Sequence, residues 1–536
     1  MYLFCFQVGA GRFPEALKKF FVTKRNYILL FLIFVIAYFF RAYYIPEKKV
    51  IFGYEQARDA FVVQDLLHGD FKILGPQATT EGLHHGVFYY YLIAPAYFFG
   101  KGDPTIVAYW LALLNSLTVF VVFYLTYLLT KKPTPALLAS LFFAFSFEST
   151  QYATWLSNPT FAVFSVPLIY LGLWIWVNST FQNKKFDKWL GPIITSIGLG
   201  LSIQSEIFLI YHIVPVILWI LLLRKNLTAK QVLIFFIVLA VTLLSMVIAE
   251  AKFGFQLVKG VVNLAANKDK IIETKYLGDF IIYYLNQLGN IFSDNLFPVN
   301  SGYGGFMGLF ILIYSFASWV TKRTIKILSW EPFLITYILS HIIVVSLGGL
   351  NARYLTVGLG TGVIILAAIF VYNFIEKRKY TIYILVMVIL ISNASTIFSK
   401  GKEGQVILAN QKDLLLSNEL AAVEYTYVEA NKQPFSINTI TNPLWMNATW
   451  SYIYNWYGNK NYGYLPYWRG RDQVGQLGNN LNVPPEELDL HFLIVEPPQG
   501  IPGVYLESEN GFENNRSQVI KDIQFGDIRV DKRKLK

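Results

Sequence analysis

Long apolar segments recur between residues 27 and 391, and short loops rich in lysine and arginine separate many of them. Most segments are 15 to 24 residues long, and a transmembrane helix needs about 20. The pattern predicts an α-helical polytopic membrane protein with about 11 spans. The expected spans are residues 27–44, 106–129, 136–152, 161–177, 189–203, 207–223, 232–249, 305–320, 332–347, 355–372 and 380–391.

Basic residues mark one side of this arrangement. With these spans, five basic loops fall on the same side of the membrane: residues 131–134, 183–188, 224–230, 321–326 and 376–379. Cytoplasmic loops carry such an excess of lysine and arginine. We therefore expect a multi-pass protein of the cell (plasma or inner) membrane, in contact with membrane lipids. Its amphipathic, basic residues 1–26 would be cytoplasmic and its C-terminus would lie outside.

Two loops and the C-terminal region are expected on the outer face. The loops are residues 53–103 and 252–303. Residues 87–100 form an apolar segment of 14 residues, which suits an interfacial or re-entrant helix better than a span. The spans end near residue 397, and residues 398–536 are less hydrophobic.

The C-terminal region 398–536 reads as a small extracytoplasmic α/β domain. Residues 415–432 have the pattern of a helix, and three segments have the pattern of strands. The expected strands are residues 434–442, 489–498 and 525–532. The stretch 445–468 is rich in tyrosine and tryptophan, so it would suit either sugar stacking or a platform at the membrane interface.

Composition narrows the classes of function. Charged residues make up 15% of the 536-residue chain, against about 25% in soluble domains, and the mean hydropathy is +0.43. The net charge of +11 is explained largely by loops flanking spans, so we expect no nucleic-acid partner. Cys5 is the single cysteine, which excludes an intramolecular disulfide framework and a thiolate metal site.

The loop 53–103 gathers polar residues beside the membrane. Charge there is costly, so the cluster predicts a functional site, with a solvated loop as the alternative. The cluster consists of Glu55, Arg58, Asp59, Asp65, His68, Glu81, His84 and His85.

Carboxylates also recur where expected spans end on the outer side. Glu55 follows the first span, Glu148 lies near the end of the third, and Glu206 lies at the bend between the fifth and sixth, while Asn158 is close to Glu148 in sequence. Three converging turns would hold a divalent cation such as Mg²⁺ or Mn²⁺, or would position an acid or base. Glu81 and Asn158 join Glu148 and Glu206 as candidates for binding an acceptor or a metal. A solvent-exposed carboxylate at a helix end is the alternative for Glu148 and for Glu206.

The remaining candidates are histidines and an arginine. Adjacent side chains such as His84 and His85 point apart, which favours hydrogen bonding or phosphate contact over metal binding; a structural role is the alternative. Arg353 stands at the outer start of an expected span. Its guanidinium would either extend to the interface or bind a lipid phosphate through two hydrogen bonds.

The motif EQAR at residues 55–58, followed about 25 residues later by LHHGVFYY at residues 83–90, resembles the GT-C type membrane glycosyltransferases. The match is to the family 39 group, which includes protein O-mannosyltransferases and the aminoarabinose transferase of lipid A. Glu55 stands where that family usually has Asp, Gln56 where it has Glu, and His84-His85 where it has prolines. Residues 155–161, 200–206 and 351–355 are similar to later family landmarks, so the resemblance covers about residues 25–395.

This resemblance implies transfer of a sugar from a polyprenyl-phosphate donor to a lipid or protein acceptor on the outer face, with inversion at the anomeric carbon. Glu55 would be the catalytic base, with Asp59 as its competitor. Arg58 and Arg353, with His84 and His85, would bind the donor phosphate.

Two other classes of function remain as alternatives. A transporter or lipid flippase would line its path with the same polar residues, but the chain has no internal repeat and no acids deep within spans. A non-catalytic, glycan-binding relative is compatible with the departures at Glu55 and Gln56.

Overall fold

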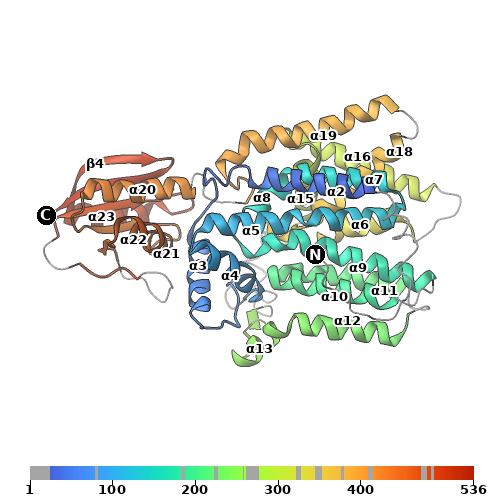
Figure 1. Cartoon of the computed structure of the whole chain (residues 1–536), viewed down its shortest axis with the longest axis horizontal. Coiled ribbons are helices and arrows are strands. Elements are labelled where there is room, and N and C mark those ends of the chain that lie inside the picture. Colours follow the sequence, from blue (N-terminus) through green and yellow to red (C-terminus); the bar gives the residue numbers. More distant parts are fainter. Residues whose placement is uncertain are drawn as a thin grey trace.

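The computed structural model describes residues 24–78, 83–182, 187–222, 227–256, 259–260, 277–321, 328–344, 353–375, 379–408, 414–471, 480–484 and 488–536. The expected N-terminal surface segment 1–26 therefore lies almost wholly outside the described residues. The chain forms a long helical bundle with a smaller α/β domain beyond one end (Figure 1). The expected fold class is confirmed.

Apolar helices make up the bundle. Five are long and apolar enough to cross a membrane by length and composition, and a bent pair would make a sixth. The five are Arg25–Ala42, Pro104–Thr130, Asn158–Ser179, Ser301–Val320 and Tyr383–Glu403, and shorter apolar helices cover Pro133–Phe145, Ile207–Leu222 and Leu359–Phe374. These counts cover the described part of the chain, and the number of about 11 spans stays a prediction.

The helices follow the expected spans closely at most positions. Their bounds are α2 Lys24–Ala42, α5 Pro104–Ser116, α6 Thr118–Thr130, α9 Ala162–Gln182, α10 Asp187–Ser205, α11 Ile213–Leu222, α16 Ser301–Val320, α17 Trp330–Leu339, α18 Leu359–Ile375 and α19 Lys379–Lys400. Short 3₁₀ turns flank them at η1 Asn158–Phe161, η2 Ile207–His212, η4 Ser340–Ile343 and η6 Arg353–Leu355. Irregular backbone of this kind is tolerated at membrane depth where protein surrounds it.

Two expected spans are broken. The segment 136–152 divides at Ser146 into α7 Pro133–Phe145 and α8 Phe147–Ala153, because the Ser146 side chain accepts a hydrogen bond from the Ser149 N–H and caps a new helix. The segment 232–249 divides into α12 Ala229–Thr242 and α13 Leu244–Lys252, bent by 60°. There the Gln204 amide donates to the Thr242 carbonyl at 2.8 Å. A side chain that inserts into the helical hydrogen-bond ladder is a recognised cause of a bend.

The last helix is longer than expected. α19 has 22 residues where 12 were expected, because its second half is polar and lowers the hydropathy. Those polar side chains are used for packing: Asn393 donates to the Asn295 carbonyl at 3.1 Å and accepts from the Phe147 N–H at 2.9 Å. A buried amide that is fully engaged can replace apolar surface within a bundle.

Close helix contact at α9 and α10 depends on glycine. A Cβ atom placed on Gly191 would lie 2.4 Å from the Trp176 nitrogen, and one on Gly198 would lie 2.6 Å from the Ile169 nitrogen. Small residues let helix backbones approach in this way. The contact fixes the end of α10, where Glu206 lies.

A buried arginine joins three helices of the bundle. Arg41 of α2 is 2% exposed. It donates to Asn115 Oδ1 at 2.6 Å and to the carbonyls of Phe143 and Ala144 at 3.1 Å. Both carbonyls lie in the last turn of α7, where a helix leaves carbonyl groups short of donors, so the guanidinium supplies further hydrogen bonds there.

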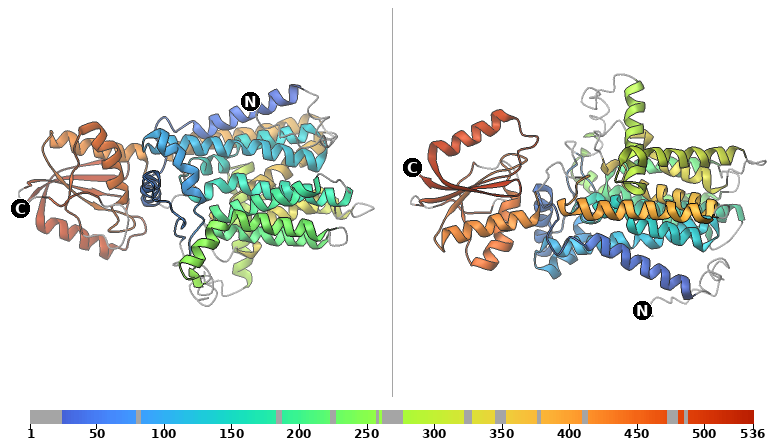
Figure 2. Two further views of the ribbon diagram at one scale, coloured as in Figure 1. Left: turned by 60° about the horizontal axis from the view of Figure 1, so that its bottom comes forward. Right: turned by 90° about the horizontal axis from the view of Figure 1, so that it is seen from above.

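Three further helices belong to the two long loops predicted from the sequence. They are α3 Tyr54–Leu67, α4 Phe88–Gly100 and α15 Leu277–Leu296. The expected short helix at 87–100 is confirmed as α4. Part of the expected outer loop 252–303 is a 20-residue helix, α15, that packs against α16 and α18 and crosses the bundle at a steep angle (Figure 2).

The C-terminal domain contains a five-stranded sheet in the order β2-β1-β3-β5-β4. β1 Ser436–Ile440 pairs in parallel with β3 Leu490–Val495, and β5 Ile528–Leu535 pairs with β3 antiparallel. The expected helix is α20 Leu416–Ala430, and three expected strands are present. The remaining elements are β2 Tyr467–Trp468, β4 Ser517–Phe525, α21 Ala448–Ile453, η8 Tyr454–Gly458, α22 Asn459–Tyr462 and α23 Gly503–Arg516.

Hydrogen bonds and apolar contacts connect the C-terminal domain to the segment between α2 and α5. The Leu416 N–H donates to the Val50 carbonyl at 2.9 Å, and the Tyr452 hydroxyl donates to the Gly102 carbonyl at 2.7 Å. One buried cluster of apolar side chains runs from Phe52 and Ala57 to Trp450 and Phe492. Shared burial of this kind joins the two parts into one body.

Candidate functional site

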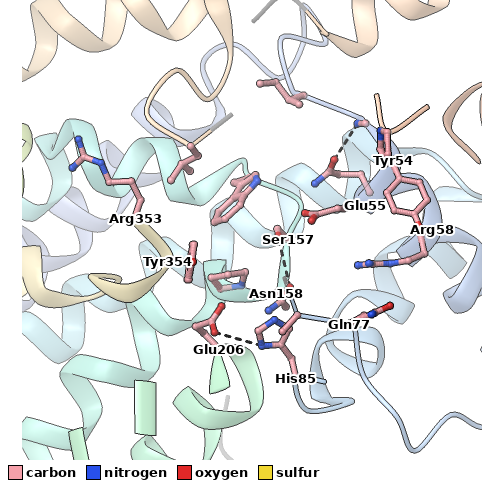
Figure 3. Close-up of a pocket in the computed structure, with 18 of the residues that line it drawn as sticks. Tyr54, Glu55, Arg58, Gln77, His85, Ser157, Asn158, Glu206, Arg353 and Tyr354 are labelled. Atoms are coloured by element: carbon pink, nitrogen blue, oxygen red, sulfur yellow. Dashed lines mark hydrogen bonds and ion pairs between the residues drawn. The ribbon is translucent and has the colours of Figure 1, made fainter. Parts of the chain in front are cut away.

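A cavity of about 480 Å³ opens where the bundle, the first outer loop and the C-terminal domain meet. This volume is within the range of small-molecule sites, roughly 300–1,000 Å³. Its lining is Ile51, Gly53, Tyr54, Glu55, Gln56, Arg58, Gln77, Ala78, His85, Trp155, Ser157, Asn158, Pro159, Glu206, Phe208, Arg353, Tyr354, Leu408, Leu414, Asn442 and Pro443. Segments that lie far apart in the sequence therefore contribute to one site (Figure 3).

Helix α3 supplies a carboxylate and a guanidinium from its first two turns. Gly53 is the N-cap residue that precedes the helix, and its N–H donates to Gln56 Oε1 at 3.0 Å. This bond gives Gln56 a capping role at the position where the resembling family has Glu. Residues three apart share a helix face, and Figure 3 shows Glu55 and Arg58 both directed into the cavity. Glu55 is exposed.

Asp59 fixes the direction of Arg58. Arg58 Nε donates to Asp59 Oδ1 at 2.9 Å, and Arg58 Nη2 lies 2.8 Å from the same oxygen. Burial raises the pKa of Asp59 to about 6, although Arg58 acts in the opposite direction. Asp59 is 2% exposed and does not line the cavity. This geometry favours Asp59 as a positioning residue for Arg58.

Glu206 and His85 meet on the opposite wall. His85 Nδ1 lies 3.6 Å from Glu206 Oε1 and accepts a hydrogen bond from the Ile207 N–H at 3.2 Å. Burial raises the pKa of Glu206 to about 8 and lowers that of His85 to about 3. Near neutral pH the pair is therefore an uncharged imidazole beside a mostly protonated carboxyl.

Asn158 and Arg353 complete the polar lining. The Asn158 amide donates to the Ser205 carbonyl, next to Glu206. Arg353 Nη1 lies 2.7 Å from Asp294 Oδ2, and its carbonyl accepts from the Tyr152 hydroxyl at 2.7 Å. In Figure 3 its guanidinium is turned away from Glu55 and Arg58.

Other predicted residues lie apart from the cavity. Glu148 accepts from Asn295 Nδ2 at 2.6 Å within a buried network and does not line the cavity with Glu55 and Glu206. Its role in binding an acceptor or a metal stays a prediction. His84 Nδ1 lies 3.1 Å from the Gly75 carbonyl oxygen, and its side chain does not line the cavity. Glu81 lies outside the described residues.

Few side chains that could coordinate a metal ion lie together in the described residues. Among the residues that the structure describes, no group of three or more His, Cys, Asp and Glu side chains gathers closely enough to hold a metal ion. Within the cavity, His85 and Glu206 supply two neighbouring donors. Binding of Mg²⁺ or Mn²⁺ here stays a prediction.

Several lining residues were not anticipated from the sequence. Gln77, Phe208, Asn442 and Pro443 were not among the expected site residues, because each reaches the cavity through tertiary packing. The dipeptide Asn442-Pro443 stands at the end of a predicted strand, and such a dipeptide indicates a turn. A turn at the end of a strand was therefore predictable, but its position against the membrane bundle was not.

Comparisons with solved structures decide the fold. The ArnT protein of Cupriavidus metallidurans bound to undecaprenyl phosphate matches with a TM-score of 0.56 and 9% identity, over 94% of this chain and 97% of that one. The apo oligosaccharyltransferase of Archaeoglobus fulgidus matches with a TM-score of 0.51 and 13% identity, over 81% of this chain. This is the GT-C fold.

The match to the oligosaccharyltransferase covers 64% of that protein's length. No family model and no curated protein matches the sequence. At such identities the likeness concerns the fold, and the expected resemblance to GT-C membrane proteins is confirmed at that level. Membership of family 39 stays a prediction.

Proposed function

We propose that the chain is an inverting glycosyltransferase that moves a sugar from a polyprenyl-phosphate donor to an acceptor at the outer membrane face. The observation that carries this proposal is the pairing of Glu55 and Arg58 on one face of α3, both directed into the same cavity. A transferase of this kind needs a base for the acceptor and a cation for the leaving phosphate.

The reaction assigns each group a task. The acceptor hydroxyl oxygen attacks the anomeric carbon from the side opposite the phosphate, and its proton passes to the Glu55 carboxylate. The bond between the anomeric carbon and the phosphate oxygen breaks, and the electron pair leaves with the lipid phosphate. Arg58 stabilises this charge, and Asp59 holds Arg58 in place. Attack from the opposite side inverts the anomeric centre.

Glu206 suits binding better than proton abstraction. A protonated carboxyl donates a hydrogen bond, and the raised pKa keeps Glu206 largely protonated near neutral pH. We therefore assign to Glu206 and Asn158 the positioning of sugar or acceptor hydroxyls. His85 acts as a neutral neighbour that orients Glu206.

The donor proposal has support from the fold. The ArnT structure with the same fold holds undecaprenyl phosphate, and the cavity of this chain lies at the outer end of an apolar bundle. A polyprenyl chain can occupy the membrane while its phosphate reaches arginines at the boundary. We assign the phosphate to Arg58 and Arg353.

A direct test uses the purified full chain in lipid nanodiscs with undecaprenyl phosphate carrying a radiolabelled sugar. We expect saturable binding of undecaprenyl phosphate and release or transfer of the sugar. Transfer to a defined acceptor should give a product of inverted configuration. Absence of both donor binding and sugar release would refute the proposed function.

The topology is part of the proposal, with the basic loops cytoplasmic and the C-terminal domain outside. In a Cys5→Ser background, Glu507→Cys on exposed α23 should react with an impermeant thiol reagent in intact cells. Thr134→Cys, at the exposed start of α7, should react after lysis. The opposite result would invert the topology and remove the cavity from the outer face.

A further inference from the structure

The C-terminal domain contributes a wall to the cavity through residues 441–447, the segment between β1 and α21. Asn442 and Pro443 line the cavity. Trp445 follows two residues later, so its Cα atom lies within roughly 7 Å of that of Pro443. The segment that carries the exposed Trp445 is therefore the one that forms this wall of the cavity.

This segment is held rigidly without help from the Trp445 ring. The Asn442 N–H donates to Glu496 Oε2 at 2.9 Å, and the Asn442 amide donates to the Gln499 carbonyl at 2.7 Å. Thr441 Oγ1 donates to the Pro443 carbonyl at 2.8 Å and accepts from the Met446 N–H at 3.3 Å. These bonds fix the backbone on both sides of Trp445.

The backbone of Trp445 has an unusual conformation. Its φ angle is 64°, a left-handed conformation that is rare for a bulky residue and marks strain that the surroundings must maintain. The indole N–H donates to Glu509 Oε1 at 3.0 Å. Glu509 is held in turn by Arg471 at 3.2 Å. The hydrogen bond to Glu509 thus holds one edge of the indole ring, while 43% of the residue stays exposed.

We propose that Trp445, with Asn442 and Arg471 beside it, forms a subsite for the carbohydrate part of the acceptor. The apolar C–H face of a sugar ring packs on a flat indole, and its hydroxyls bond to the amide and guanidinium at the edge. A purely apolar chain would cover these polar groups without replacing the hydrogen bonds that they make to water. This inference rests on the proposed function, because it assigns the bundle side of the cavity to the donor.

The test is equilibrium binding in nanodiscs loaded with undecaprenyl phosphate, on an immobilised panel of methyl hexosides, N-acetylhexosaminides, pentosides and disaccharides. The variants are Trp445→Ala, Trp445→Phe and the control Trp189→Ala. Trp189 matches Trp445 in exposure, at 41%, and lies on α10 away from the cavity. Undecaprenyl phosphate binding is measured in parallel on every variant.

We expect wild type and Trp189→Ala to bind at least one glycoside class equally, and Trp445→Ala to bind it at least tenfold more weakly. Trp445→Phe should keep most of the binding because it keeps a ring. Undecaprenyl phosphate binding should not change by more than twofold. The subsite would be overturned by an absence of glycoside binding in wild type, or by equal binding in wild type and Trp445→Ala. A loss of undecaprenyl phosphate binding in Trp445→Ala would also overturn it. Glycoside binding without any sugar transfer would instead count against the proposed reaction alone.

Discussion

Arg353 is paired with Asp294, whose Oδ2 lies 2.7 Å from Arg353 Nη1 at the rim of the cavity. The guanidinium is consequently turned away from Arg58, although Arg353 lines the same cavity. A lipid phosphate that uses Arg353 has to compete with this carboxylate. We therefore expect the ion pair to lower the affinity of Arg353 for the phosphate in the proposed site.

Substitutions at these two residues separate the competing roles. Arg353→Ala should weaken undecaprenyl phosphate binding by about 10- to 100-fold, since a charged hydrogen bond contributes about 1.5–3 kcal/mol. Arg353→Lys should lose less, because it keeps the charge. Asp294→Asn should strengthen binding several-fold by removing the competitor. Weaker binding in Asp294→Asn would mean that Asp294 holds Arg353 ready for the phosphate. Equal binding by all variants would remove Arg353 from the site.

Glu55 is expected to be the base. Glu55→Gln keeps the shape and removes the charge, so turnover should fall by roughly 10²-fold or more while the protein stays folded. Asp59→Asn should cost less, because it loosens Arg58 without removing the base. The assay is sugar transfer from radiolabelled undecaprenyl phosphate-sugar in membranes.

Glu55→Asp restores the residue usual in the resembling family and should keep part of the activity. A shift of about 1 Å in a reacting group can cost about 10²-fold, so the retained fraction reports how closely the site is built for Glu. Full activity of Glu55→Gln together with an inactive Asp59→Asn would transfer the role of base to Asp59. Full activity in both would refute this site.

Glu206 should make stability fall as the pH rises. Its pKa is raised by burial to about 8, so the native state keeps a proton that the unfolded chain loses above about pH 4.5. The loss of stability between those pH values is on the order of 5 kcal/mol for one carboxyl. Glu206→Gln should flatten the dependence of Tm on pH between 6.5 and 8.5. The unfolded chain's histidines titrate near pH 6.5, and the folded-state pKa values of Asp59 and His85 lie below this range. These contributions are the same in wild type and in Glu206→Gln and therefore cancel in the comparison. An unchanged slope would show that Glu206 is ionised in the folded protein.

Glu513 is expected to be a structural residue of the C-terminal domain. His491 Nε2 lies 3.2 Å from Glu513 Oε2, and Arg516 and Asn438 also bind this carboxylate. Burial alone would raise the pKa of Glu513, but His491 and Arg516 hold it at about 2. Its stabilisation is present above about pH 4.5 and is lost as the pH falls towards 2.

Glu513→Ala should destabilise the domain by about 3–5 kcal/mol, because it leaves buried charge without a partner. Glu507→Ala, on the exposed face of the same helix, is the control. Thermal unfolding followed by tryptophan fluorescence measures both.

Ser436 lies 2.9 Å from His491 Nδ1, yet Ser436, His491 and Glu513 are all fully buried. A fluorophosphonate probe should therefore leave Ser436 unlabelled in the folded protein.

Hydropathy predicted the bundle because the cost of placing polar backbone and charge in lipid is large and local. It did not predict the breaks at Ser146 and Thr242, because their causes are a cap and the Gln204 side chain from another helix. The site residues likewise include some that the sequence predicts and others that only tertiary packing brings together. Glu55 and Arg58 share one helix turn and could be found from spacing, whereas the contact of Glu206 with His85 depends on tertiary packing.

Asn442 and Pro443 come late in the chain, whereas Glu55 and Arg58 come early. The ribosome delivers the chain from its N-terminus, and domains fold as they emerge. The carboxylate and the guanidinium thus reach the membrane surface while the far wall of their cavity has yet to be translated. The pocket is completed last, after the C-terminal domain has folded onto the first outer loop. A half-made chain therefore has no complete cavity, and any reaction at Glu55 and Arg58 depends on the finished C-terminal domain.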